Sequence, residues 1–195
     1  MLEQFRAYLE KRIKLTDEQF KFISKDLKTK TFEKNQIILS KGEVSSKTYF
    51  VVEGLLRSYS IDEKGKVHII QFAPESWWIS ERNGLFNEPS DFFIDAVETT
   101  SAIVIPRNYF HDAIIHVPEL HDLNYTMLNN SIRFMHKRIN MLLSATAEDR
   151  YLDFTKLYPN LSLRVPQWMI ASYLGITPES LSRVRKDLAH KPLKS

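Results

Sequence analysis

The chain has 195 residues, of which 43% are hydrophobic and 26% are charged, a composition typical of a soluble globular protein and not of a disordered one. It has no run of 18 apolar residues and no cysteine, which excludes a transmembrane helix, disulfides, thiolate metal sites and cysteine-ligated iron–sulfur clusters. Its first residues are charged, so we expect no secretory signal peptide, no membrane partner and a cytoplasmic location.

The formal net charge of +3 is unevenly distributed along the chain. From Asn160 onward there are six basic and two acidic side chains, whereas the remainder has 21 basic and 22 acidic ones. A surplus of positive charge at one end is typical of a nucleic-acid-binding module attached to a domain with a different task.

The first 27 residues have helical periodicity, and Thr16 followed by Gln19 predicts a capping box at the start of a second helix. From Lys30 to Pro106 the pattern changes to short β-rich runs. These runs are 37–39, 49–52, 55–61, 67–72, 92–97 and 102–105.

Two turn signals lie between these runs. Asp62–Gly65 predicts a hairpin turn, and Glu53-Gly54 predicts another. No helical pattern separates the runs, so a parallel sheet with helical crossovers is excluded. We therefore expect an antiparallel β-roll of the jelly-roll type with flanking helices, which makes the chain an α+β protein.

The segment from Pro118 to about Ser144 predicts one long helix with apolar residues on more than one side. About 27 residues span about 40 Å in a helix. Such a helix is expected to pack against its own domain and against a second copy of itself, which predicts a homodimer through residues 118–145. A single buried helix in a monomer is the alternative. Thr146 with Asp149 predicts the start of the next helix, and Pro159 predicts its end.

Residues 165–186 have the spacing of two short helices that cross. Ala171 is small enough to lie where the helices touch, and Gly175 permits the positive φ of the turn between them. Thr177 can cap the second helix, and Pro178 suits its first position. The pattern predicts a DNA-reading helix-turn-helix; an ordinary helical hairpin with a solvated basic face is the alternative.

The second helix of this pair would present hydroxyl, guanidinium and ammonium groups on its outer face. Such groups donate hydrogen bonds to phosphates and to guanine O6 and N7. The residues expected to contact DNA are Arg164, Gln167, Thr177, Pro178, Glu179, Ser180, Ser182, Arg183 and Lys186. Lys191 and Lys194 are further candidates for phosphate contacts.

The order of roll, long helix and helix-turn-helix resembles the Crp/Fnr (catabolite-activator type) family of bacterial transcription regulators over essentially the whole chain. The motifs that carry the resemblance are Gly42-Glu43, Val52-Glu53-Gly54-Leu55-Leu56, Ser80-Glu81, Gly84-Leu85-Phe86, and Ala147-Glu148-Asp149-Arg150 through Arg183. The resemblance implies a homodimer that binds a palindromic operator in double-stranded DNA, senses a small molecule in its roll and contacts RNA polymerase. By position, it implies that Pro178, Glu179 and Arg183 lie where bases are read.

The resemblance also implies a division of the chain into three parts. These are a cyclic-nucleotide-binding-like sensor domain with N-terminal helices (1–117), a dimerisation helix (118–145) and a helix-turn-helix domain (146–195). Among the base-reading positions, we expect Arg183 to bind guanine and Glu179 to bind a cytosine amino group. Proline at position 178 has no side-chain donor, so base recognition there is expected to be weaker than with arginine.

The sequence departs from the family where a nucleotide would bind. Nucleotide-binding members carry a Gly-Glu pair and, some ten residues later, an Arg-Ser or Arg-Thr pair that holds the cyclic phosphate. Here Ser80-Glu81 is followed by a stretch, residues 87–93, that has no arginine. A phosphate would meet Glu88 and Asp91, so we predict that cyclic AMP binds weakly or not at all. A less polar effector pocket would include Ser80, Glu81, Arg82, Phe92 and Phe93.

A second departure concerns the end of the chain. Family members usually follow the recognition helix with a two-stranded wing, whereas residues 189–195 are too few for a hairpin with useful strands. We therefore expect a DNA-binding domain that lacks a full wing.

No catalytic motif or metal-ligand spacing stands out in the sequence. His111, His116 and His121 recur every five residues, which spreads them around a helix, and only His68 lies on a predicted strand. We therefore expect no metal, no cofactor and no enzymatic activity. The alternatives to an effector-controlled regulator are a DNA-binding regulator whose roll is only a scaffold and, less favoured, a β-roll metal enzyme.

Overall fold

The computed structural model describes residues 1–190, and the chain divides into two compact units. The first unit comprises residues 1–60 and 70–130, and the second comprises residues 61–69 and the chain from residue 131 onward. The three-part division predicted from the sequence stays a prediction. No helix of the described residues has both the length and the apolar content that a bilayer span requires.

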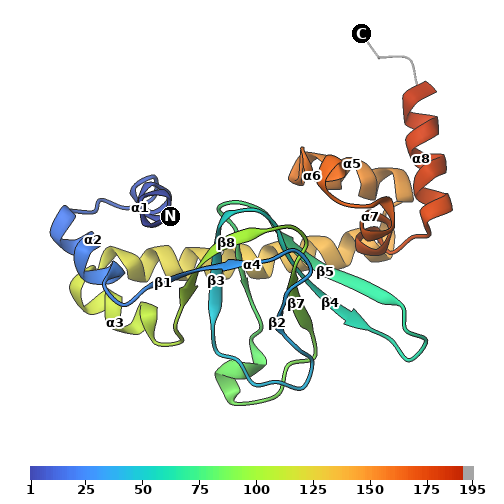
Figure 1. Ribbon diagram of the computed structural model, residues 1–195. Helices are drawn as coiled ribbons and strands as arrows, with labels where there is room; N and C mark the ends of the chain where they lie inside the picture. Colours follow the sequence, from blue (N-terminus) through green and yellow to red (C-terminus); the bar gives the residue numbers. More distant parts are fainter. Residues whose placement is uncertain (191–195) are drawn as a thin grey trace, which may run out of the picture. The chain divides into compact units, whose positions relative to one another are not determined.

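Within residues 1–190 the strands form two four-stranded sheets, drawn in blue to green in Figure 1. The strand order is β1-β8-β3-β6 in one sheet and β2-β7-β4-β5 in the other, with antiparallel pairing. The strands are β1 (Lys28–Phe32), β2 (Ile37–Leu39), β3 (Thr48–Glu53), β4 (Leu56–Ile61), β5 (Val67–Ala73), β6 (Trp78–Ser80), β7 (Phe93–Ala96) and β8 (Thr100–Ile105). The α+β class and the antiparallel roll are therefore confirmed.

Two of these strands lack the signal by which the other six are predicted. Strand β1 begins with four exposed residues and buries only Phe32, because it pairs with β8 at the edge of its sheet. Strand β6 has only three residues. Neither segment shows the alternation of apolar and polar residues that identifies a strand in a sequence.

One of the two predicted hairpins is confirmed and the other is wrong. At Asp62–Gly65 the Gly65 N–H donates to the Asp62 carbonyl (2.9 Å), and β4 and β5 are neighbours. Glu53-Gly54 instead joins β3 to β4, which belong to different sheets. Gly54 has a φ of +93°, and a Cβ there would lie 2.6 Å from the Thr100 hydroxyl oxygen. Glycine is therefore needed where the chain passes from one sheet to the other.

The roll has apolar side chains on both faces of strand β3. Tyr49 and Val51 belong to a core inside the roll together with Ile94 from the facing sheet. Phe50 and Val52 belong to a second core, formed with the helices that flank the roll. This alternation with a period of two is what a strand buried on both faces requires.

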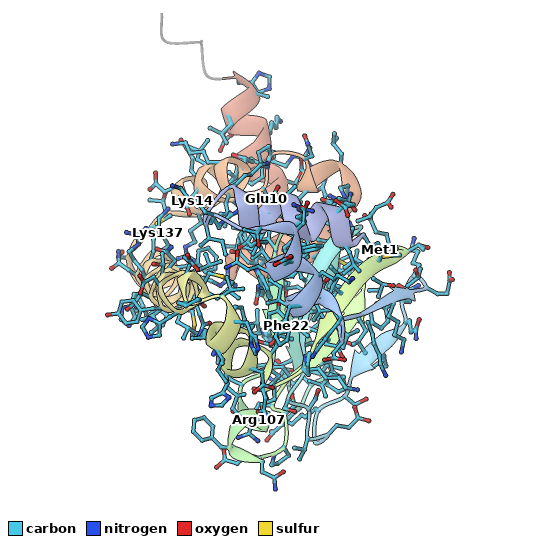
Figure 2. All side chains as sticks on the ribbon, turned by 90° about the vertical axis from the view of Figure 1, so that its left-hand side faces the viewer. Met1, Glu10, Lys14, Phe22, Arg107 and Lys137 are labelled. Carbon is cyan, nitrogen blue, oxygen red and sulfur yellow. The ribbon has the colours of Figure 1, made fainter. Side chains whose placement is uncertain are left out.

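Helices α1 (Leu2–Glu10) and α2 (Asp17–Ser24) lie within the first 27 residues, where the sequence predicts helices. The first unit also contains the 3-10 helix η1 (Asn83–Phe86) and α3 (Tyr109–His116), for which no bounds were predicted from the sequence. The predicted capping box is present: the Thr16 hydroxyl accepts from the Gln19 N–H (3.2 Å), and the Gln19 side chain accepts from the Thr16 N–H (2.9 Å). Phe22, labelled in Figure 2, stacks on exposed His116 with ring centroids 3.6 Å apart and so joins α2 to α3.

Helix α4 (Glu119–Ser144) begins in the first unit and ends in the second, and its 26 residues confirm the predicted long helix. The second unit continues with α5 (Ala147–Leu157), α6 (Leu161–Arg164), α7 (Gln167–Leu174) and α8 (Pro178–His190). The Thr146 hydroxyl caps α5 by accepting from the Asp149 N–H (3.1 Å), as predicted. The prediction of a missing wing falls on residues 189–195: the first two are the last residues of α8, and residues 191–195 lie outside the described part of the chain.

Candidate nucleic-acid interface

Helices α7 and α8 are joined by the tight turn that the sequence predicts. Gly175 ends α7 in the left-handed conformation, with a φ of +68°. Its N–H donates to the Ser172 carbonyl (3.1 Å), and the Ile176 N–H donates to the Ala171 carbonyl (3.0 Å). These two bonds satisfy the last carbonyls of α7 and reverse the chain within three residues.

The two helices cross on buried apolar side chains. Ala171 is 1% exposed and Leu181 is fully buried, while Ile170 and Leu174 add the α7 side of the contact. Val184 is half-buried on α8. The predicted crossing and the role of the small residue at position 171 are therefore confirmed.

The start of α8 is held by side-chain caps. The Thr177 hydroxyl accepts from the Ser180 N–H (3.2 Å), and Pro178 is the first helical residue. The pKa of Glu179 lies below its usual value because its carboxylate accepts hydrogen bonds from its own backbone N–H and from the Thr177 hydroxyl. A carboxylate in the first turn also interacts favourably with the helix dipole.

Most residues predicted to contact DNA lie on the exposed surface of the second unit. The exposed ones are Gln167, Thr177, Pro178, Glu179, Ser182, Arg183 and Lys186. Ser180 and Arg164 are half-buried. On α8, residues 179, 183 and 186 are separated by four and three positions, so they share one face of the helix. The Arg183 guanidinium on this face is exposed, so its donors are accessible to a ligand.

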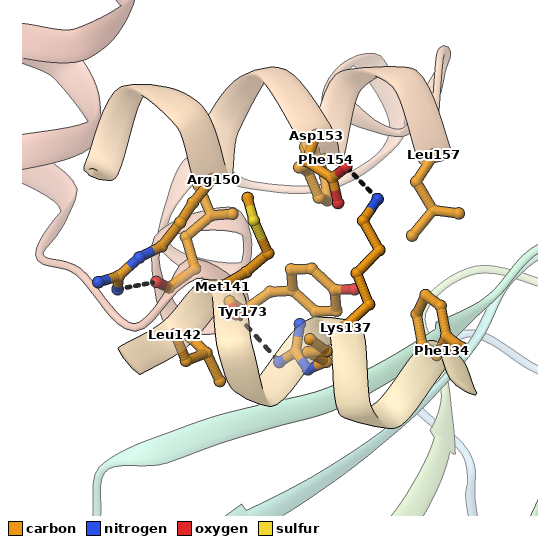
Figure 3. A pocket seen from close by; sticks show the side chains of 11 residues that line it. Phe134, Lys137, Met141, Leu142, Arg150, Asp153, Phe154, Leu157 and Tyr173 are labelled. Carbon is orange, nitrogen blue, oxygen red and sulfur yellow. Dashed lines mark hydrogen bonds and ion pairs between the residues drawn. The ribbon is translucent and has the colours of Figure 1, made fainter. Parts of the chain in front are cut away.

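Two arginines that the DNA-contact prediction did not include donate hydrogen bonds to backbone carbonyls of α7. Arg150 of α5 donates to the carbonyls of Ala145 and Leu174, both at 3.1 Å. Arg138 of α4 donates to the Tyr173 carbonyl (3.0 Å), and its guanidinium lies 3.6 Å from the centre of the Tyr173 ring. Arg150 and Tyr173 are labelled in Figure 3. No local pattern in the sequence marks such contacts, because they join different helices.

A small cleft lies among α4, α5 and α7. Its wall is mainly apolar, and an ion pair between Lys137 and Asp153 crosses it, as Figure 3 shows. The free volume is about 30 Å³. A space of this size accommodates only a few water molecules.

The residues predicted to line an effector pocket in the roll are bonded mainly to their own segment. Glu81 is buried, and its carboxylate accepts from the Asn83 N–H (2.8 Å). The Asn83 amide donates to the Pro89 carbonyl (3.0 Å) and to the Asp91 carboxylate (3.1 Å). Ser80 is half-buried and Arg82 is exposed. The polar groups of Glu81, Asn83 and Asp91 are therefore hydrogen-bonded within this segment.

The aromatic candidates pack against other rings. Phe93 stacks on Tyr59 with centroids 5.2 Å apart, and Trp78 belongs to the ring cluster around Phe5 and Phe50. Phe92 is half-buried. Packing of this kind is the ordinary use of aromatic residues in a core.

The charges of the corresponding segment are in line with the predicted weak binding of cyclic AMP, which stays a prediction. Arg82 is the one basic residue in residues 80–93, and it is exposed to solvent. The remaining charged groups, Glu88 and Asp91, are exposed carboxylates that repel a phosphate. A hollow of about 390 Å³ exists elsewhere in the first unit, between α1 and β3, with Tyr8 and Arg12 in its lining.

Residues 1–190 contain no group of side chains arranged to bind a metal ion. No three His, Asp or Glu side chains of these residues are grouped as a metal site would require. His68, the histidine on a strand, pairs with Asp62 at 2.8 Å. This pair belongs to the hairpin between β4 and β5.

Known proteins resemble this chain both within the first unit and along most of its length. The sequence profile of the cyclic nucleotide-binding domain matches residues 29–116. An anaerobic regulatory protein of Aggregatibacter actinomycetemcomitans is 26% identical over 169 residues, covering 80% of this chain and 64% of that protein. The fumarate and nitrate reduction regulatory protein of Vibrio cholerae is 27% identical over 169 residues, covering 80% and 66%. This chain thus spans just under two thirds of the length of these relatives.

Two solved structures share the fold. FixK2 from Bradyrhizobium japonicum has a TM-score of 0.71 at 23% identity, covering 84% of each chain. A mutant of CooA from Carboxydothermus hydrogenoformans has a TM-score of 0.70 at 16% identity, covering 91% of this chain and 87% of that one.

Proposed function

This chain belongs to the Crp/Fnr family, and from that premise we propose that it is a sequence-specific DNA-binding regulator of transcription that acts as a homodimer. The observation that carries the proposal is the two-sided construction of α8, in which Leu181 is fully buried while Arg183 is exposed and available. The relatives support it, because they are named as regulators and not as enzymes. We propose a cytoplasmic location, and RNA polymerase as a further partner.

Base reading is assigned to the exposed face of α8. Arg183 donates two hydrogen bonds to guanine O6 and N7, and Glu179 accepts from a cytosine amino group. Each well-aligned contact of this kind contributes ~1–3 kcal/mol of discrimination. Pro178 contributes shape but no donor. The pKa of Glu179 is lowered, which favours the ionised carboxylate, the stronger hydrogen-bond acceptor.

Phosphate contacts come from the residues around this face. Gln167, Thr177, Ser182 and Lys186 are exposed and carry amide, hydroxyl or ammonium donors. Arg164 and Ser180 complete the proposed set, and Lys191 and Lys194 lie outside the described residues. Because phosphate neutralisation supplies most non-specific affinity, binding is expected to weaken steeply as salt rises.

Dimerisation is assigned to α4. Tyr125, Ile132 and Ile139 are seven residues apart and each is more than half exposed, although they are large apolar side chains. Met135 and Leu142 follow three residues after the second and third of these. This is the 3-4 spacing of a coiled-coil seam, and a second copy of the helix supplies the matching surface. The paired recognition helices then reach successive major grooves about 34 Å apart.

The dimer is tested with one substitution on the seam and one beside it. Ile139→Lys places a charge in the proposed seam and is expected to shift the protein to a monomer in sedimentation velocity. Asn140→Lys, on the neighbouring exposed position, is expected to leave the dimer intact. A monomeric wild-type chain at micromolar concentration would contradict the assignment.

The role of the roll has two candidate forms. In one, an effector other than cyclic AMP binds and changes the affinity for DNA; in the other, the roll is a scaffold. The packed interior of the roll, with Val51 and Leu56 fully buried, favours the scaffold. A complete switch by an effector would require ~5.5 kcal/mol of differential affinity for two states.

The proposal is tested by selecting DNA sites from a random pool, with and without bacterial extract. We expect enrichment of a two-fold symmetric site, which pure protein binds in a mobility-shift assay. Tighter binding in the presence of extract supports an effector, and equal binding supports the scaffold. Enrichment of no sequence under either condition would refute the proposed function.

A further inference from the structure

Strand β5 of the β4–β5 hairpin is hydrogen-bonded to the first helix of the helix-turn-helix. Residues 61–69 belong to the same compact unit as α7. The Ser172 hydroxyl on α7 donates to the Val67 carbonyl (2.7 Å) and accepts from the Ile69 N–H (3.0 Å). One side chain thus satisfies two backbone groups of β5, two residues apart.

The position of β5 in its sheet explains why these backbone groups are available. The order β2-β7-β4-β5 places β5 at the edge, so one row of its N–H and C=O groups has no neighbouring strand in that sheet. Exposed edges of this kind bind whatever complementary donors and acceptors reach them. The Ser172 hydroxyl, which both donates and accepts, occupies the place of a residue on a partner strand.

Arg138 extends the same contact from α4. Its Nη2 donates to the Ile69 carbonyl (3.1 Å) and to the Tyr173 carbonyl (3.0 Å). Ile69 is therefore bonded through its N–H to Ser172 and through its carbonyl to Arg138. The guanidinium plane is fixed in turn by its stacking on the Tyr173 ring, 3.6 Å from the ring centre.

The hairpin tip is itself a tightly bonded turn. The Asp62 carboxylate accepts from the backbone N–H groups of Lys64 (3.0 Å) and Lys66 (2.9 Å) and pairs with His68 (2.8 Å). Gly65 turns the chain with a φ of +77°. Because these hydrogen bonds restrict the turn, we expect its position to be better defined than that of a flexible loop.

We propose that this hairpin acts as a bracket that fixes the orientation of the recognition helix, with Ser172 and Arg138 as positioning residues. The inference rests on the proposed DNA-binding function and adds how the reading face is held. The orientation of α7 determines that of α8, because the Gly175 turn is short and Leu181 is fully buried between the two helices. Neither positioning residue needs to touch DNA.

The first test uses Ser172→Ala, with Ser144→Ala as the matched control. Ser144 is exposed at the end of α4, where its hydroxyl bonds only back to the Asn140 carbonyl of the same helix. Two quantities are measured on the full chain: the exchange rate of the Ile69 amide hydrogen, and the ratio of affinity for the selected operator to affinity for unrelated DNA of equal length.

For Ser172→Ala we expect Ile69 exchange to become about fivefold faster, the effect of losing a bond worth ~1 kcal/mol. The affinity ratio is expected to fall by a similar factor, while affinity for unrelated DNA and the unfolding temperature stay close to those of the control. Unspecific binding depends mainly on charge, which the substitution does not change.

Unchanged Ile69 exchange would overturn the bracket, and faster exchange with an unchanged affinity ratio would overturn its positioning role. Arg138→Lys, compared with Arg133→Lys on an exposed position of the same helix, gives a second measurement. Lysine keeps the charge but lacks the flat guanidinium that stacks on Tyr173, so only the first variant is expected to lower the ratio. A wild-type chain that selects no operator would contradict the proposed function alone, because Ile69 exchange still tests the bracket.

Discussion

The outer face of α8 and the 80–93 segment of the roll both carry polar side chains that the sequence analysis assigned to binding, yet their hydrogen bonding differs. On α8, Arg183 extends into solvent from a helix whose opposite side is buried. In the roll segment, Glu81, Asn83 and Asp91 lie in one chain of hydrogen bonds. A face with free donors can bind a partner without losing internal bonds, whereas a segment bonded to itself must first break them.

The largest expected effect comes from the buried side of α8. Leu181→Ala removes a fully buried side chain and is expected to destabilise the protein by about 2–5 kcal/mol, with loss of operator binding. Denaturant unfolding measures the stability. Leu163→Ala, at a residue that is 87% exposed, is the control and is expected to change stability by about 0.5 kcal/mol or less. Equal losses of stability in the two variants would mean that the burial of Leu181 does not support the exposed face of α8.

A second substitution asks whether the roll segment is structural. Glu81→Ala leaves the Asn83 N–H without its charged acceptor, so we expect a loss of about 1.5–3 kcal/mol in stability and no change in DNA affinity. Glu88→Ala, at an exposed carboxylate of the same segment, is the matched control. A large change in operator affinity with Glu81→Ala but not with Glu88→Ala would show that residues 80–93 influence DNA binding.

A third substitution tests base reading. Arg183→Ala is expected to weaken operator binding by ~1–3 kcal/mol and to relax sequence preference at one base pair of each half-site. Arg185→Ala removes the same charge from a neighbouring exposed position of α8 and is expected to leave the preference unchanged. Repeating the site selection with both variants measures this, and identical preferences in the two would contradict the assignment.

The helix cap has a smaller expected effect. Thr177→Ala removes the acceptor of the Ser180 N–H and is expected to cost about 1 kcal/mol of stability. Thr155→Ala removes a hydroxyl that bonds only to the Leu152 carbonyl within α5, so it serves as the comparison. Thermal unfolding measures both variants; no difference between them would show that α8 does not depend on its cap.

The smallest effect concerns pH. The pKa of Glu179 is lowered in the folded chain, so this carboxylate stabilises α8 above its unfolded pKa, about 4.3, and the contribution is lost as pH falls through the folded pKa. The protection of the α8 amide hydrogens, taken relative to the intrinsic exchange rate at each pH, is therefore expected to fall on acidification. Glu179→Gln is expected to remove this dependence, and an identical dependence in the variant would assign it to another group.

Cyclic AMP offers a check on the roll that needs no variant. Because residues 80–93 present Glu88 and Asp91 where a phosphate requires a cation, calorimetry is expected to detect no binding at micromolar concentrations. Micromolar affinity would contradict the expected lack of cyclic AMP binding and would indicate that the roll senses nucleotides.

Local signals in the sequence predicted much of the DNA-binding half. The small residue at 171, the turn glycine at 175 and the cap at 177 lie within seven positions of one another, and each acts on its immediate neighbours. The long helix and the capping box at Thr16 were predicted for the same reason. Strand β1 was not, since an exposed edge strand needs no alternating apolar pattern.

The sequence by itself determined the long helix α4, the two helices of the helix-turn-helix, the residues that α8 buries and the position of its turn, because these depend on contacts between residues a few positions apart. The tertiary structure alone decided that Glu53-Gly54 joins two sheets instead of closing a hairpin. It also decided that Ser172 and Arg138 meet Ile69, from positions 103 and 69 residues away. Serine and arginine serve many purposes in a sequence, and only the folded chain shows which distant backbone groups they reach.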